Sequence, residues 1–111
     1  MSQVYAENLE KADIDIATSG DNTVISAPSS GYIVIDFITL LPTTAVAVQM
    51  KDGSTAYGGP LPLAALQPFT FENTMHNEKG VITLSPGSAF IINLGGAVQC
   101  GGFVRYRVIG A

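Results

Sequence analysis

The sequence is poor in charge and has very few of the residues that catalytic and metal sites use most. Lys, Arg, Asp and Glu make up 13% of its 111 residues, about half the share found in an average domain. It contains one histidine, one cysteine and no tryptophan. Its five basic residues and net charge of -4 do not suit binding to a phosphate backbone. We therefore expect no nucleic-acid partner.

Long apolar runs are missing as well. No run approaches the roughly 18 residues that a membrane-spanning helix needs, and the first residues, MSQVYAENLEK, lack the basic and apolar stretches of a signal peptide. A lone cysteine, Cys100, cannot form an internal disulfide. We therefore expect a chain made in the cytoplasm that has no membrane partner.

What the sequence does have is apolar residues, which make up 47% of the chain. That share excludes intrinsic disorder, and the length suits one domain with one core. A small monomer needs many polar groups to cover its surface. The low charge therefore indicates that another subunit or a partner covers part of this surface.

Apolar and polar residues alternate with a period of two from residue 12 onward, and Gly and Pro turns divide the chain into short runs. We expect strands near 12–18, 22–26, 31–41, 45–51, 54–57, 67–74, 79–84, 87–94 and 98–109. Residues 61–67, LPLAALQ, are the one candidate for a helical turn. The pattern predicts an all-β, jelly-roll-like antiparallel β-sandwich of about eight strands. It forms a single domain over residues 12–111, preceded by an N-terminal arm over residues 1–11.

Two of these strands are apolar on both faces, although a sandwich covers only one face of each sheet. Strict alternation in 31–41 places Ile33, Ile35, Phe37 and Leu41 on the core face and Tyr32, Val34, Ile38 and Leu40 opposite, with Asp36 among them. In 87–94, Ile91 lies opposite Phe90, Ile92 and Leu94. The second face needs a cover, and we predict a homo-oligomer interface that includes Tyr32, Val34, Ile38 and Ile91.

Arg105 and Arg107 share one strand face and are added to this interface, because Arg suits bidentate contacts with carboxylates across a subunit or capsid boundary. A solvated strand edge remains an equal alternative for this pair. Asp13 and Asp15 also share a face. Their spacing occurs in calcium sites, but it occurs far more often on any solvated strand.

Groups that catalyse reactions are hard to assemble from this sequence. His76 lies in a polar segment and lacks an evident partner, and Cys100 between polar and glycine residues suits a small buried side chain better than a nucleophile. The glycine-rich pieces do not lead from a strand into a helix, so they are not phosphate loops. We therefore expect neither an enzyme nor a cofactor or metal.

The order of the segments carries a resemblance. Ile25-Ser26-Ala27-Pro28 leads through Gly31-Tyr32-Ile33-Val34 to Met50-Lys51-Asp52-Gly53-Ser54-Thr55-Ala56 and Gly59-Pro60-Leu61-Pro62-Leu63. The last pieces are Pro86-Gly87-Ser88-Ala89-Phe90-Ile91-Ile92-Asn93-Leu94 and Val98-Gln99-Cys100-Gly101-Gly102-Phe103-Val104-Arg105-Tyr106. Over residues 22–109 this resembles small jelly-roll virion proteins of tailed bacteriophages, which decorate capsids or form part of head or tail fibres.

The resemblance implies a structural role. The chain would be a capsid decoration, or cement, protein that binds the assembled head as a homotrimer, contacts the major capsid protein and stabilises the shell. Its location would be the capsid surface of the virion, and Val4, Tyr5 and Leu9 would belong to a capsid-binding arm.

Two other classes of function remain to be weighed. One is a receptor- or glycan-binding domain of a phage head or tail fibre, using Tyr57 and the 73–77 loop. A cupin-like metal enzyme is the third class, and a single histidine makes it the weakest.

Overall fold

The computed structural model describes residues 9–74 and 78–110, and its secondary structure there consists of strands. Ten strands follow in chain order: β1 (Glu10–Ile16), β2 (Gly20–Ile25), β3 (Tyr32–Pro42), β4 (Val46–Asp52), β5 (Thr55–Ala56), β6 (Leu61–Leu63), β7 (Phe69–Glu72), β8 (Ile82–Thr83), β9 (Phe90–Leu94) and β10 (Cys100–Ile109). The described residues contain no helix of the length and hydropathy needed to cross a membrane.

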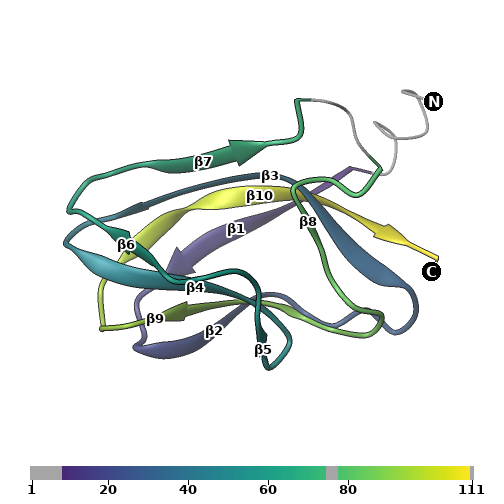
Figure 1. The fold of residues 1–111 in the computed structure, drawn as a ribbon, viewed down its shortest axis with the longest axis horizontal. Coiled ribbons are helices and arrows are strands. Elements are labelled where there is room, and N and C mark those ends of the chain that lie inside the picture. Colours follow the sequence, from purple (N-terminus) through teal and green to yellow (C-terminus); the bar gives the residue numbers. More distant parts are fainter. Residues whose placement is uncertain (1–8, 75–77, 111) are drawn as a thin grey trace.

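The strands form two antiparallel sheets that pack as a β-sandwich (Figure 1). Sheet A has the order β1-β10-β3-β7, with β8 also paired to β3; sheet B has the order β2-β9-β4-β5, with β6 also paired to β4. The chain crosses between the sheets along most of its length, so that β1-β10-β3-β7 packs over β2-β9-β4-β6. The predicted fold class, a single all-β sandwich, is confirmed.

The core lies between the two sheets and is built from alternate residues of the strands. Its fully buried members include Ile14 of β1, Ile33, Ile35, Ile38 and Leu40 of β3, Val48 of β4, Phe90, Ile92 and Leu94 of β9, and Val104 of β10. Each such side chain contributes about 1.5–3 kcal/mol through its removal from water. The predicted core face of the 87–94 strand, formed by Phe90, Ile92 and Leu94, is confirmed.

Strand β3 contains a β-bulge that reverses its alternation. Arg105 of β10 lies opposite Phe37 and Tyr106 lies opposite Ile35, so Asp36 is an extra residue in the register. Because one extra residue turns the following side chains to the other face, Ile38 and Leu40 point into the core. Phe37 then lies on the outer face. The predicted faces of this strand are correct up to Asp36 and wrong beyond it.

The segment after Pro60 also differs from expectation. Leu61–Leu63 forms strand β6 against β4, although residues 61–67 were the one candidate for a helical turn. A tight turn follows, in which the Ala64 amide donates to Oε1 of Gln67 at 2.7 Å and the Gln67 amide donates to the Ala64 carbonyl at 3.1 Å. At the other end of the fold, β1 begins at Glu10, inside the range predicted as an arm.

Candidate interaction surface

The face of sheet A that points away from sheet B carries three apolar side chains, which we call the outer patch: the half-buried Phe37 and Phe103 and the exposed Leu41. The rings of Phe37 and Phe103 lie 5.4 Å apart between centroids and are tilted by 33°. The side chain of Leu41, nearby on β3, is 37% exposed. An apolar group on an exposed sheet face is typical of a surface that another molecule covers.

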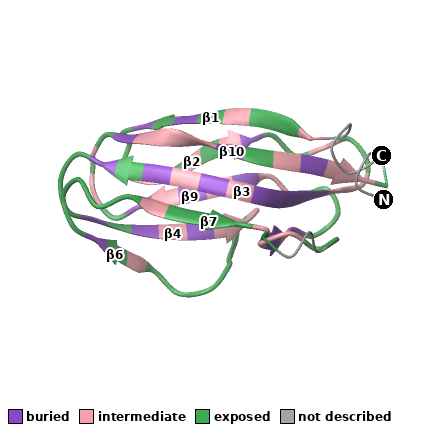
Figure 2. Cartoon of the chain, turned by 90° about the horizontal axis from the view of Figure 1, so that it is seen from above, coloured by how far each residue is buried: buried purple, intermediate pink, exposed green. Residues whose placement is uncertain are grey.

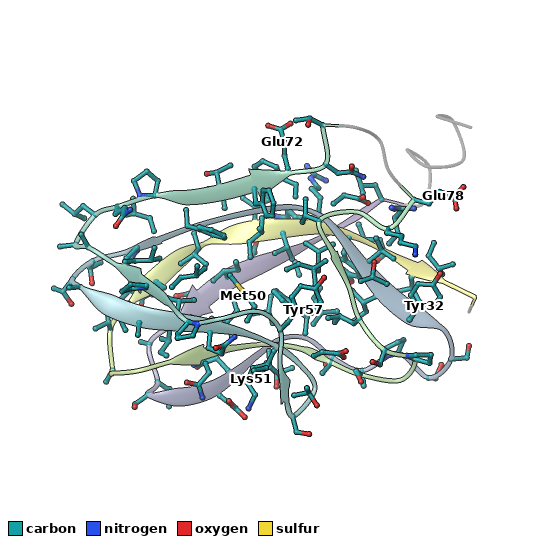
Figure 3. All side chains as sticks on the ribbon, viewed as in Figure 1. Tyr32, Met50, Lys51, Tyr57, Glu72 and Glu78 are labelled. Carbon is teal, nitrogen blue, oxygen red and sulfur yellow. The ribbon has the colours of Figure 1, made fainter. Side chains whose placement is uncertain are left out.

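Charged residues flank this patch in one row across the strands. Arg105 of β10 and Glu72 of β7 both lie opposite Phe37, one on each side, so all three side chains share the outer face. Both charged residues are exposed, and Figure 3 shows Glu72 on the outer side of β7. Within residues 9–74 and 78–110, neither has an ion-pair partner. The row therefore reads positive, apolar, negative from β10 to β7.

The first half of β3 is covered differently, and Figure 2 shows it buried. Its outer face holds a buried ion pair in which Nε of Arg107 donates to Oδ2 of Asp36 at 2.6 Å and Nη2 donates to Oδ1 at 2.9 Å. Nη2 also donates to the Glu78 carbonyl at 3.0 Å, and Nδ2 of Asn73 donates to Oδ1 of Asp36 at 3.0 Å. The two charges satisfy each other at the bulge, as burial of charge requires.

The turn that leads into β8 closes over this ion pair. Gly80 adopts a positive φ of 62°, and a Cβ at this position would overlap the Ile35 carbonyl and lie 2.7 Å from Cγ1 of Val34. The Val81 amide donates to the Ile35 carbonyl at 2.8 Å, so the segment also joins the edge of sheet A. Val34 is consequently fully buried by its own chain.

The six predicted interface residues do not lie on one surface. Val34, Ile38 and Arg107 are buried within the chain, Ile38 in the core and the other two beneath the turn at residues 78–80, so their assignment to an exposed subunit interface is wrong. Arg105 is exposed on the outer face of sheet A, and Ile91 is half-buried on β9. The structure replaces the predicted set with the outer patch.

Tyr32, the remaining predicted interface residue, borders a half-open hollow of about 300 Å³ at the start of β3. The lining consists of Tyr32, Glu78, Lys79, Thr83, Leu84 and Pro86. It combines one ring and an apolar wall with a carboxylate, an ammonium group and a hydroxyl. Of the predicted arm residues, Leu9 is half-buried, and Val4 and Tyr5 lie outside the described residues.

The outer face of sheet B is polar. The Asp21 carboxylate accepts hydrogen bonds from Nδ2 of Asn93 at 2.7 Å and from Nζ of Lys51 at 3.0 and 3.1 Å. These bonds, that of Asn93 foremost, lower the pKa of Asp21 below its ordinary value because they favour the charged form. This face satisfies its own polar groups, in contrast to the outer patch.

The groups considered for chemistry are not assembled into a reactive site. Cys100 is fully buried, and burial raises the pKa of its thiol. Asp13 is paired with Lys11 at 2.9 Å, and Asp15 accepts a hydrogen bond from Nε2 of Gln99 at 2.7 Å. No group of three His, Cys, Asp or Glu side chains in the described part of the chain is arranged to hold a metal ion. His76 lies outside that part.

Comparison with protein-family models, with curated proteins and with solved structures finds no match to this chain. The strongest candidate for a functional surface is therefore the one that the structure itself shows, the outer patch with its row of opposite charges.

Proposed function

We propose that the chain is a structural protein of a phage virion, a capsid decoration protein that binds the assembled head as a homotrimer and stabilises it. The observation that carries the proposal is the outer patch of Phe37, Leu41 and Phe103 on a domain with little charge. Such a surface supports a protein that works in contact with copies of itself and with the major capsid protein. The β-sandwich of two antiparallel sheets agrees with the resemblance to small virion proteins.

The stabilisation follows from mass action. A protein that binds the assembled shell, and not its separated subunits, shifts the equilibrium toward the shell by an amount set by its concentration relative to its dissociation constant. A trimer adds multivalency, because once one subunit is bound the other two bind at high effective concentration. Modest contacts at each subunit are then sufficient.

The test is co-sedimentation of the purified chain with undecorated heads of its own phage, followed by thermal disruption of the heads. We expect the chain to sediment with the heads and to raise their disruption temperature. Phe103→Asp, on the outer patch, should weaken both effects, whereas Thr23→Asp, on the exposed edge strand β2 of sheet B, should not. If the wild-type chain stays in the supernatant at all concentrations, the proposal is wrong.

The hollow beside Tyr32 favours a second candidate, a receptor- or glycan-binding domain of a head or tail fibre. Its ring and its Glu78 and Thr83 side chains are of the kinds that hold a sugar. Binding on a glycan array that is lost in Tyr32→Ala would promote this candidate, and an array with no positive glycan would remove it.

A further inference from the structure

We infer that copies of this chain meet through the outer face of sheet A, with Arg105 of one copy paired to Glu72 of the next. The inference rests on the proposed function in naming the surface that joins the copies. It goes beyond that function in stating which groups pair and how the copies are oriented.

The centre of this surface is apolar. Phe37 and Phe103 present their tilted ring pair, and Leu41 lies beside them on β3. The neighbour of Leu41 on β10 is Gly101, which has no side chain to separate Leu41 from a second sheet. Aromatic side chains of this kind contribute most of the energy in many protein interfaces.

The flanks of the surface are complementary to each other. Arg105 and Glu72 lie one strand to either side of Phe37, which places them roughly 10 Å apart at the usual spacing of two strand intervals. Each is exposed and lacks an ion-pair partner within the described residues. A foreign partner would need a matching pair of charges, whereas a second copy of this chain supplies both by itself.

Symmetry fixes the orientation of the copies. Rotation about an axis parallel to β3 brings the β10 side of one copy against the β7 side of the next, so Arg105 meets Glu72. Rotation about an axis perpendicular to the strands would instead place Arg105 over Arg105 and Glu72 over Glu72, which like-charge repulsion disfavours. The first arrangement keeps the strands of neighbouring sheets aligned, a common mode of sheet packing.

The pairing is compatible with a two-fold dimer and with a closed ring, because both can use an axis parallel to the strands. Closure of the ring then covers the apolar centre of every copy. In both arrangements, another copy of this chain covers the surface and makes the Arg105–Glu72 contact.

The experiment is a charge exchange followed by sedimentation equilibrium across a concentration series. We expect the wild type to self-associate and Arg105→Glu and Glu72→Arg each to weaken association by about tenfold or more. The double variant, with the two charges exchanged, should recover most of the wild-type association. Asp21→Arg changes the net charge as much as Glu72→Arg but lies on the outer face of sheet B, away from the proposed contact, and it should associate like the wild type. Circular dichroism verifies the fold of each variant.

A wild type that remains monomeric over the whole series overturns the inference, and so do single variants that associate normally or a double variant that does not recover. Mixing the two single variants is a further test, because each copy then offers its charges to the opposite variant. We expect full recovery for a two-fold dimer and partial recovery for a ring of three, in which one contact must join two copies of the same variant. A mixture that associates no better than either variant alone contradicts the pairing.

The two proposals fail separately. If the chain self-associates through Arg105 and Glu72 but does not sediment with heads, the interface stands and the decoration function fails. If a monomeric chain sediments with heads, decoration stands without this interface.

Discussion

Single residues decide how closely β3 and β10 pair within sheet A, and Gly102 of β10 shows how little room this pairing leaves. Its φ of +153° is rarely adopted by residues with a side chain, and a Cβ there would overlap the Thr39 carbonyl and lie 2.8 Å from the Leu40 Cα. A Cβ at the neighbouring Gly101 would have its nearest atom, the Ile14 carbonyl oxygen, at 4.0 Å. Thus a side chain has no room at Gly102, whereas it has room at the adjacent Gly101.

We predict that Gly102→Ala lowers the free energy of unfolding by on the order of 3 kcal/mol, because backbone strain and overlap with β3 add together. Gly101→Ala should change it by less than about 1 kcal/mol. Chemical denaturation at one fixed protein concentration measures both. Equal losses in the two variants would contradict the described close pairing of β10 with β3.

The bulge makes a second prediction at the scale of residues, because it exchanges the positions of Phe37 and Ile38. Ile38 is fully buried in the core, so Ile38→Ala should cost about 2–5 kcal/mol of stability. Phe37 is half-buried on the outer patch, so Phe37→Ala should cost about 1 kcal/mol, mainly from its contact with Phe103. Strict alternation along β3 demands the reverse order, and denaturation of the two variants discriminates between the two arrangements.

At the scale of elements, the alternation of apolar and polar residues was sufficient to predict most strands and the sandwich. It also placed Phe90, Ile92 and Leu94 correctly, because β9 itself contains no extra residue: it pairs with β4 without a shift, and the bulge opposite it lies in β2. The alternation failed in β3, because both faces of this strand are apolar. The hydropathy pattern therefore does not reveal the extra residue at the bulge. The one available signal was Asp36, a charge inside an apolar run that needs a buried partner.

The candidate surface was less predictable than the fold for the same reason. Once Asp36 is known to bind Arg107, the two arginines of β10 separate into a buried one and an exposed one. Because they are two residues apart in the sequence, their spacing alone does not predict which of them is buried. The cover over Val34 comes from residues 78–81, distant in sequence, and the low charge of the chain does not distinguish such a cover from a second subunit.

The ion pair at the bulge can be tested by removing one partner. Arg107→Leu leaves the Asp36 carboxylate buried without its counter-charge, so we predict a loss of about 3–5 kcal/mol. Asp36→Leu combined with Arg107→Leu should recover much of this loss, since no charge then remains buried. Urea denaturation of both variants provides the comparison. A single variant as stable as the wild type would mean that the pair is hydrated.

On sheet B, the hydrogen bond from Asn93 is the main cause of the lowered pKa of Asp21. Asn93→Ala should therefore raise this pKa toward the ordinary value of 3.8, as measured by NMR titration of the carboxyl group. Because the pKa is lowered in the folded state, the stabilisation is present above the unfolded value and is lost as the pH falls through the folded value. The variant should accordingly lose less stability than the wild type on acidification below about pH 4. An unchanged pKa in Asn93→Ala would contradict this cause.

At the scale of the whole molecule, the sandwich separates two kinds of outer face. Sheet B carries a polar face whose Asp21, Lys51 and Asn93 are satisfied within the chain. Sheet A has one half covered by its own turn at residues 78–80 and another half that presents the outer patch between Arg105 and Glu72. The low charge of the sequence thus accompanies an apolar patch on sheet A, and this patch is the surface that we propose for association in a virion.

The most direct test of that role is the number and position of copies in purified phage particles, from quantitative mass spectrometry combined with cryo-electron microscopy of the head. If the chain is a decoration protein, its copy number should equal the number of local three-fold positions of the shell multiplied by the number of subunits in the oligomer. Density for the chain should then lie at those positions. A handful of copies at one vertex would indicate a fibre instead, and complete absence of the chain from the particle would contradict the account.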